Sequence, residues 1–483
     1  MKIYKVLNEL ISYAKRHLAL CERDVMYIQN EILDVLHLGC WKESECETVD
    51  DIDALLKEFV SVAVEEKVFE REDGAYYTDK IMGILSLSPS GVDEAFAKVL
   101  AEKGSRDATE WLYEYSVANN YVKKAVLDKN PRFDRNGLVI TINLAKPEFR
   151  DPNKAKSGNS VAGGYPKCVI CRENEGLASR NKCTLRTVSL ILDGKPWFWQ
   201  FSPYGYFYQH GIAVNCEHTP MKIDRQTFVN LLDFVDQFPH YFIGCNATLE
   251  RIGGSVLAHD HYQGGGEVLP MHNAKIRVPL TLDGFDDLNF GILDWPGTVV
   301  RVSGKDKAKI IDACDKIRIA WKDFTDESQE LVCRSERGQH HSVSPTVVKR
   351  GDTYEVSVIL RSNLTSEKYP DGIYHAHPEF HIIKKESIGL IEAQGLFILP
   401  GRLEKQLKEL EECVKNGSLT DDLSDFEFIY NEVKVIYDSG VEASEAVKEE
   451  LGSVCYRILQ NTAVFANDDL FLNFLHEIGF NKA

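Results

Sequence analysis

The segment Gly253–Gly266 combines histidines, a glutamine and a run of glycines in a way that suits phosphoryl chemistry. We expect a strand over Ser255–His261, and side chains two apart in a strand share a face, so His259, His261 and Gln263 would point the same way. The glycines let a ligand approach the backbone and leave N–H donors for phosphate oxygens. A neutral imidazole beside such donors can attack phosphorus, while the glutamine holds a nonbridging oxygen. The alternative is a strand with two histidines that are either at the surface or hydrogen-bonded, running into a flexible glycine loop.

Cys168 and Cys171 form a Cys-x-x-Cys pair, the spacing at which two thiolates reach one tetrahedral zinc ion. Two further ligands must come from elsewhere in the chain, and His218 and His259 are the candidates. The alternatives are two ordinary buried cysteines or a redox pair, although the residues around them do not match the thioredoxin-like Trp-Cys-Gly-Pro-Cys context. Spacing alone leaves these interpretations open.

A third group of possible ligands consists of His375, His377 and His381. They could bind a metal or contact a substrate, or they could simply form the polar face of a strand. Glu267 and Glu379 are carboxylates that could join a metal site. The spacing favours none of these roles.

A basic segment interrupted by glycines precedes the histidine motif and would suit a phosphate or diphosphate. The alternative is a solvated surface loop. Its basic residues are Lys146, Arg150, Lys154, Lys156, Lys167, Arg172, Arg180, Lys182 and Arg186.

The chain as a whole is acidic, because its 483 residues include 56 Lys and Arg against 74 Asp and Glu, a formal net charge of −18. This balance argues against a nucleic-acid polymer as partner, since a phosphate backbone requires clustered basic residues. No apolar run approaches the roughly 20 residues of a membrane-spanning helix, and the charged N-terminal stretch does not resemble a signal peptide. The twelve cysteines are therefore interpreted as reduced thiols in a cytoplasmic protein.

The elements that must position these residues change in character along the chain, and the predicted fold class is α+β. Helical spacing of apolar residues dominates the two ends, and two mixed units of strands and helices lie between them, each ending in a His-x-His. The predicted division is 1–130 as a helical accessory domain, 131–289 and 290–402 as the two mixed units, and 403–483 as C-terminal helices.

Local turn and cap residues sharpen three of these elements. Pro89–Gly91 is expected to break the N-terminal helical region, with a helix restarting at Asp93. Asp193-Gly194 predicts a hairpin turn, since both residues tolerate a positive φ. Asp224 is a plausible N-cap for a helix that runs through Gln237.

Several ordered motifs together resemble the galactose-1-phosphate uridylyltransferases, in particular their longer bacterial subfamily within the histidine-triad-like superfamily. The resemblance runs from about residue 130 to 410. The motifs are Lys167–Glu175, Ser202-Pro203-Tyr204, Glu217–Met221, Gly253–Gly265, Ile388–Glu392 and Leu399–Leu403.

The resemblance implies two histidine-triad-like halves of mixed or antiparallel sheet and a ping-pong transfer of UMP. His261 would attack the α-phosphorus of UDP-glucose, and galactose 1-phosphate would then take the UMP from the histidine. Gln263 would steady the transferred phosphoryl group. The substrate-binding residues implied in the same way are Asn246, Gly253, Gly254, Ser255 and Lys385.

The resemblance also implies a structural zinc ion with Cys168, Cys171, His218 and His259 as its ligands. The better-known branch of the family has a second metal site, but no histidine stands at the matching position near Leu360-Arg361, so a second metal is not predicted. A homodimer is the family expectation.

Two alternatives stay open on the sequence alone. The first is another histidine-triad nucleotidyltransferase or hydrolase that uses a different base or acceptor. The second is a zinc-stabilised nucleotide-binding protein without turnover. Product analysis across nucleotide sugars separates the first from UMP transfer, and exchange of labelled hexose phosphate separates the second.

Overall fold

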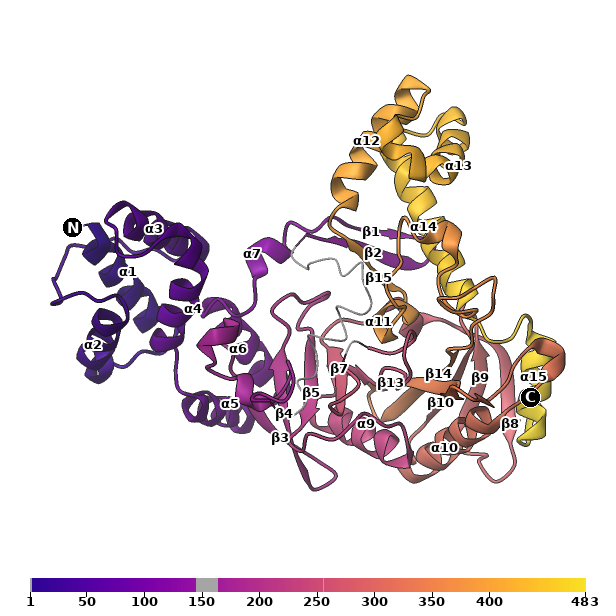
Figure 1. The fold of residues 1–483 in the computed structure, drawn as a ribbon. Helices are drawn as coiled ribbons and strands as arrows, with labels where there is room; N and C mark the ends of the chain where they lie inside the picture. The colour runs from indigo at the N-terminus through magenta and orange to yellow at the C-terminus, as the bar shows by residue number, and fades with distance from the viewer. Residues whose placement is uncertain (1, 145–163, 255) are drawn as a thin grey trace. The chain divides into compact units, whose positions relative to one another are not determined.

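Residues 2–144, 164–254 and 256–483 are described in the computed structural model of the chain (Figure 1). Contacts group the chain into two units, of which unit 1 comprises 1–128, 161–205 and 211–217, and unit 2 comprises 129–160, 206–210 and 218–483. Helices together with a mainly antiparallel sheet confirm the predicted α+β class. The predicted four-part division of the chain stays a prediction.

Unit 1 begins with amphipathic helices, as its apolar spacing predicts. In α1 (Lys2–His17), the buried side chains Ile3, Leu7 and Leu10 recur every three or four residues and so lie on one face. The helices that follow are α2 (Val25–Val35), α3 (Ile52–Glu65), α4 (Gly74–Leu85), α5 (Pro89–Lys103), α6 (Ser105–Ala118) and α7 (Lys124–Leu127).

Helix α5 begins at Pro89, so the expected break at Pro89–Gly91 with a restart at Asp93 is wrong. A proline costs little in the first helical turn, because the N–H that it lacks has no partner within the helix there. Ser88 caps this helix by accepting a hydrogen bond from the N–H of Gly91 at 3.2 Å.

The strands of unit 1 are β3 (Val188–Leu192), β4 (Lys195–Phe201) and β5 (Gly211–Asn215), and successive strands pair antiparallel. The predicted hairpin turn is confirmed, with φ of 46° at Asp193 and 71° at Gly194.

Unit 2 contains an antiparallel sheet with the strand order β16-β8-β9-β10-β14-β13-β6-β7. Its strands are β6 (Phe242–Gly244), β7 (His261–Gly265), β8 (Ile276–Leu282), β9 (Asn289–Leu293), β10 (Val299–Gly304), β13 (His341–Arg350), β14 (Thr353–Ser362) and β16 (Phe480–Lys482).

One face of this sheet carries α9 (Arg225–Gln237) and α10 (Lys307–Asp323), which both pack on β13. The Asp224 carboxylate accepts hydrogen bonds from the first turn of α9, which confirms the predicted cap and helix. From α9, Asn230 donates a hydrogen bond to the hydroxyl of Tyr262 at 2.9 Å, so Tyr262 points to the helix-covered face. Because side chains alternate along β7, His261 and Gln263 point to the opposite face, which we call the site face.

The pairing register extends the site face across the sheet. Gln263 pairs with Gly244, Gly244 with Thr346, and Thr346 with Ser357, and paired residues project to the same side. The Thr346 hydroxyl donates a hydrogen bond to the Gln394 side-chain oxygen at 2.9 Å. Gln394 directly follows α11 (Leu390–Ala393), so the segment around α11 lies over the site face.

The predicted strand over 255–261 is wrong, because β7 begins only at His261. Two hydrogen bonds link the backbone just before β7 to the irregular segment 219–221 instead. As a result, His259 lies outside the strand, and only His261 and Gln263 keep the predicted shared face.

The remainder of unit 2 is a small sheet with helices packed on it. In this sheet β15 (Leu396–Pro400) pairs parallel to β2 (Leu138–Asn143), which pairs antiparallel to β1 (Arg132–Arg135). The predicted C-terminal helices are α12 (Leu403–Asn416), α13 (Glu427–Asp438), α14 (Ala443–Asn461) and α15 (Asp468–Glu477). A separate two-stranded antiparallel ribbon consists of β11 (Arg334–Ser335) and β12 (Gly338–Gln339). Among the described helices, none has the length and apolar character needed to cross a membrane.

Buried histidines of unit 2, among them His210, His272 and His341, make its stability depend on pH. Burial lowers the pKa of His210 to about 4, of His272 to about 3 and of His341 to about 4. Between pH 6.5 and these values, the unfolded chain binds protons that the folded chain does not. The free energy of unfolding must therefore fall as the pH is lowered from 6.5 toward 4, by roughly 3 kcal/mol for His210 alone.

Urea unfolding of the wild type and of a His341→Phe variant would measure this effect. The variant lacks one titrating ring but can keep the stack that His341 makes on Trp321, whose ring centroid lies 4.2 Å away. Its loss of stability between about pH 7 and about pH 4.5 should be smaller than that of the wild type by about 2 kcal/mol. Equal losses would contradict the assignment.

Candidate functional site

His261 stands at the start of β7 and is 5% exposed. Its Nδ1 lies 2.8 Å from the backbone oxygen of His259, which can only accept a hydrogen bond. Nδ1 therefore carries the hydrogen, and Nε2 of the neutral ring keeps its lone pair. Burial lowers the pKa of His261, with the hydrogen bond to His259 opposing it. The arrangement presents a nitrogen nucleophile on the site face.

Asn246 lies next to two glycines of the predicted phosphate-binding segment. A Cβ built on Gly254 would lie 2.9 Å from the Asn246 amide nitrogen, and one on Gly253 would lie 2.1 Å from the oxygen of Ala247. The side-chain oxygen of Asn246 accepts a hydrogen bond from the N–H of Leu390 at 2.8 Å. Its amide nitrogen is buried and has no hydrogen-bond partner within the described chain, so a donor is available here.

Of the other predicted substrate-binding residues, Ser255 lies outside the described residues and Lys385 is exposed. The neighbouring Lys384 is 1% exposed and pairs with Glu392 at 3.0 Å. Glu392 in turn accepts a hydrogen bond from the N–H of Gly389 at 3.2 Å. Lys384 thus fixes the segment that meets Asn246, a role that the sequence analysis missed because nothing local distinguishes two adjacent lysines.

Arg361 occupies the position at which the sequence lacks a histidine for a second metal. Its side chain is 1% exposed and donates a hydrogen bond to the oxygen of Ile388 at 2.8 Å. Burial lowers the pKa of Arg361 to about 10, with Glu392 opposing the shift, so the guanidinium stays charged at neutral pH. A fixed positive charge at this position disfavours a second cation beside it.

The third histidine group is held by backbone carbonyls. His375 lies 3.2 Å from the oxygen of Ala376, His381 lies 3.0 Å from the same oxygen, and His377 lies 3.0 Å from the oxygen of Ile373. The described part of this segment forms no strand, so the polar strand face considered for these residues is wrong.

The basic segment is described only in part, and Lys146, Arg150, Lys154 and Lys156 lie outside the described residues. Arg186 is buried and donates hydrogen bonds to the backbone oxygens of Leu87, Cys183, Leu185 and Gly83. Its guanidinium is therefore committed to holding unit 1 together.

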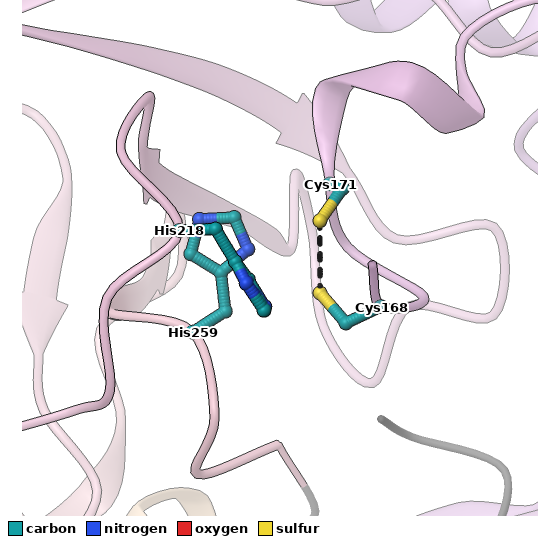
Figure 2. A group of neighbouring side chains, drawn as sticks. All are labelled: Cys168, Cys171, His218 and His259. Carbon is teal, nitrogen blue, oxygen red and sulfur yellow. Dashed lines mark hydrogen bonds between the residues drawn. The ribbon is translucent and has the colours of Figure 1, made fainter. Parts of the chain in front are cut away.

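A cluster of two cysteines and two histidines provides a candidate metal centre. One ligand atom from each of Cys168, Cys171, His218 and His259 lies within 4.8 Å of the others (Figure 2). The two sulfurs are 3.2 Å apart, and the rings of His218 and His259 meet edge to face with centroids at 4.4 Å. The four predicted ligands are thus brought together.

The chemistry of this cluster fits a metal ion. Nε2 of His218 is buried and has no hydrogen-bond partner in the described chain, as expected for a nitrogen that coordinates a metal ion. Burial, together with the neighbouring Cys168, raises the pKa of Cys171 to about 12. Metal binding must therefore displace a thiol proton here.

Known proteins are similar in sequence to this chain over nearly its whole length. The model of the galactose-1-phosphate uridyl transferase N-terminal domain matches residues 16–220, and that of the C-terminal domain matches residues 233–426. The galactose-1-phosphate uridylyltransferase of Bifidobacterium longum is 49% identical and covers 99% of this chain and 98% of its own. That of Lactococcus lactis is 36% identical, covering 99% of this chain and 100% of its own. The crystal structure of yeast Ap4A phosphorylase matches 58% of this chain and 82% of its own at 11% identity, with a TM-score of only 0.30.

The glycines of β7 generate a prediction about packing. A Cβ on Gly264 would lie 2.1 Å from the oxygen of Phe242 and 2.9 Å from the side chain of Ile243. Gly264→Ala should therefore force β6 and β7 apart and lower the free energy of unfolding by about 2–3 kcal/mol. Thermal unfolding measures the loss. Gly39→Ala is the matched control, since no atom lies within 4 Å of its added Cβ, and equal stability of the two variants would contradict this account.

Proposed function

The chain belongs to the galactose-1-phosphate uridylyltransferase family, and we propose that it transfers UMP from UDP-glucose to galactose 1-phosphate through a covalent intermediate on His261. The observation that carries this proposal is the match to such enzymes over 99% of the chain at 49% identity, with both family domains present. The chain is accordingly a nucleotidyltransferase. The tautomer and burial of His261 support its role as the nucleophile.

In the first step, Nε2 of His261 attacks the α-phosphorus of UDP-glucose. A nitrogen–phosphorus bond forms while the bond from phosphorus to the bridging oxygen breaks, and glucose 1-phosphate leaves with the electron pair. The hydrogen bond from Nδ1 of His261 to the oxygen of His259 at 2.8 Å supports the positive charge that the ring acquires.

In the second step, a phosphate oxygen of galactose 1-phosphate attacks the same phosphorus, and the bond to His261 breaks to release UDP-galactose. We assign Gln263 to hold a nonbridging oxygen during both steps, because it shares the site face with His261. We assign the buried amide nitrogen of Asn246 to a phosphate oxygen. The substrate-binding assignments of Gly253, Gly254, Ser255 and Lys385 stay proposals from the resemblance.

Incubation with UDP-glucose labelled in its uridine should leave about one equivalent of UMP on the protein. The bond should be labile in acid and stable in alkali, as expected for a phosphorus–nitrogen bond to histidine. His261→Ala should form no labelled protein and should lower turnover by about a thousandfold or more, because the reaction path is removed while the binding residues remain.

His476→Ala is the matched control, since this histidine is exposed on α15. The control should be labelled as fully as the wild type. An active wild-type protein that carries no label would contradict the covalent mechanism, and so would labelling of His261→Ala.

We further propose that Cys168, Cys171, His218 and His259 hold one structural zinc ion. When bound, the ion would cross-link segments far apart in the sequence and stabilise the fold. Because the ligands come from protein alone and fill a tetrahedron, the site would leave no position for substrate.

Elemental analysis of purified protein should give about one zinc per chain. Cys168→Ser should lower this ratio to near zero and also lower the melting temperature, since a bound metal stabilises the folded state. Cys314→Ser is the control, because it changes a buried cysteine of α10 outside the cluster. It should keep its zinc, and a ratio near zero in active wild-type protein would contradict the assignment.

Two further proposals concern the setting of the enzyme. We propose a homodimer, as the family resemblance implies, which the mass of the native protein in solution would test. We also propose a cytoplasmic location, in keeping with cysteines that form no disulfide in the described chain.

A further inference from the structure

The loop Tyr206–His210 lies directly against the glycines that end β7. A Cβ built on Gly265 would lie 2.5 Å from the oxygen of Gln209 and 2.8 Å from the ring of Phe207. The N–H of Gly266 donates a hydrogen bond to the oxygen of Tyr208 at 3.1 Å. The loop can approach β7 this closely only because position 265 has no side chain.

Within this loop, the ring of His210 is clamped between two aromatic neighbours. Its centroid lies 5.0 Å from that of Tyr206, which stacks on it, and 4.5 Å from that of Phe207. His210 is 5% exposed. The ring therefore has a fixed orientation, and its two nitrogens point to fixed partners.

These partners determine which nitrogen carries the hydrogen. The backbone N–H of Tyr206 donates to Nδ1 of His210 at 3.4 Å, so Nδ1 is an acceptor. Burial lowers the pKa of His210 to about 4, with the contact to Gln263 opposing the shift, so the ring is neutral at physiological pH. A neutral imidazole with an accepting Nδ1 carries its hydrogen on Nε2.

Nε2 of His210 lies 3.4 Å from the side-chain oxygen of Gln263 and therefore donates to it. This contact decides which way the amide of Gln263 is turned, because its oxygen faces His210. The amide nitrogen has no hydrogen-bond partner among the described residues. It is thus left as a donor beside His261, which precedes it by two residues on the same face.

We propose that His210 is a positioning residue, which turns the amide of Gln263 so that its N–H groups face the phosphoryl oxygens during transfer. The inference rests on the proposed function, because it presumes that Gln263 contacts the transferred group. Without the His210 donor, the Gln263 amide could rotate and present its oxygen to a negatively charged phosphoryl group. That arrangement would repel the substrate in the transition state.

The test compares the rate at which UDP-glucose uridylylates the full-length chain in the wild type and in five variants. His210→Phe can keep the aromatic stack but removes the donor, and it should slow uridylylation by about 10- to 100-fold. The KM for UDP-glucose should change by less than about threefold, because the lost interaction acts mainly in the transition state. His210→Gln provides an amide N–H in a similar place and should recover most of the rate.

Combining His210→Phe with Gln263→Ala distinguishes positioning from a general effect on the fold. If His210 acts through Gln263, the double variant should be no slower than Gln263→Ala alone, within about twofold. His341→Phe is the matched control, because it removes another buried neutral histidine away from the site, and it should keep the wild-type rate.

Three outcomes would overturn the inference. A wild-type rate in His210→Phe would contradict it while leaving the proposed function intact. If His210→Phe slows uridylylation by the same factor in the wild type and in the Gln263→Ala variant, His210 acts only on the fold. A wild-type protein that UDP-glucose does not label would contradict the proposed function and this inference together.

Discussion

The close antiparallel pairing of β7 with β6 is the constraint on which the candidate site depends. Gly264 faces the oxygen of Phe242 at a distance that no Cβ could occupy, and Gly265 does the same for the loop that carries His210. Because the strand is fixed from both sides, its alternation leaves one choice for His261 and Gln263, which both turn to the site face. The glycines thus determine where the reactive side chains point, even though they perform no chemistry themselves.

Burial governs the protonation of the site as much as its geometry. His210 is kept neutral by desolvation, and the pKa of His261 is lowered for the same reason. A neutral ring with one hydrogen has one donor and one acceptor, so each backbone contact selects a tautomer. In His261 the selection leaves a nucleophilic Nε2, and in His210 it leaves a donating Nε2. The same physical effect therefore prepares one histidine to react and the other to orient its neighbour.

Local chemistry in the sequence predicts some elements well. Asp193-Gly194 predicts the observed turn and Asp224 the observed helix cap, because a few adjacent residues decide each of them. The starts of β7 and α5 differ from the prediction. The start of β7 depends on which distant segment pairs with the backbone before it, and α5 starts at a proline that the first helical turn tolerates. Similarly, the prediction that His259 lies in a strand is wrong, although His259 does join the predicted cluster of ligands.

Residues that act through partners distant in the sequence, such as His210 and Lys384, cannot be identified from the local sequence pattern. His210 contacts Gln263 only because the loop Tyr206–His210 folds onto β7. Lys384 and Lys385 are adjacent and identical in type, and only the fold decides that Lys384 is buried while Lys385 is exposed. Spacing along the chain identifies only Cys168 and Cys171 as a pair and leaves His218 and His259 as candidates, whereas the family motifs imply all four as one set of ligands. Long-range contacts of this kind depend on the complete fold and not on propensity.

The central claim is that the nucleotide is carried on His261 during transfer. Tandem mass spectrometry of the protein, quenched during reaction with UDP-glucose and digested under alkaline conditions, would locate the UMP group on an individual residue. The account predicts UMP on the second histidine of the His259-Asp260-His261 motif. UMP found on His259, on His210 or on any residue other than His261 would contradict it.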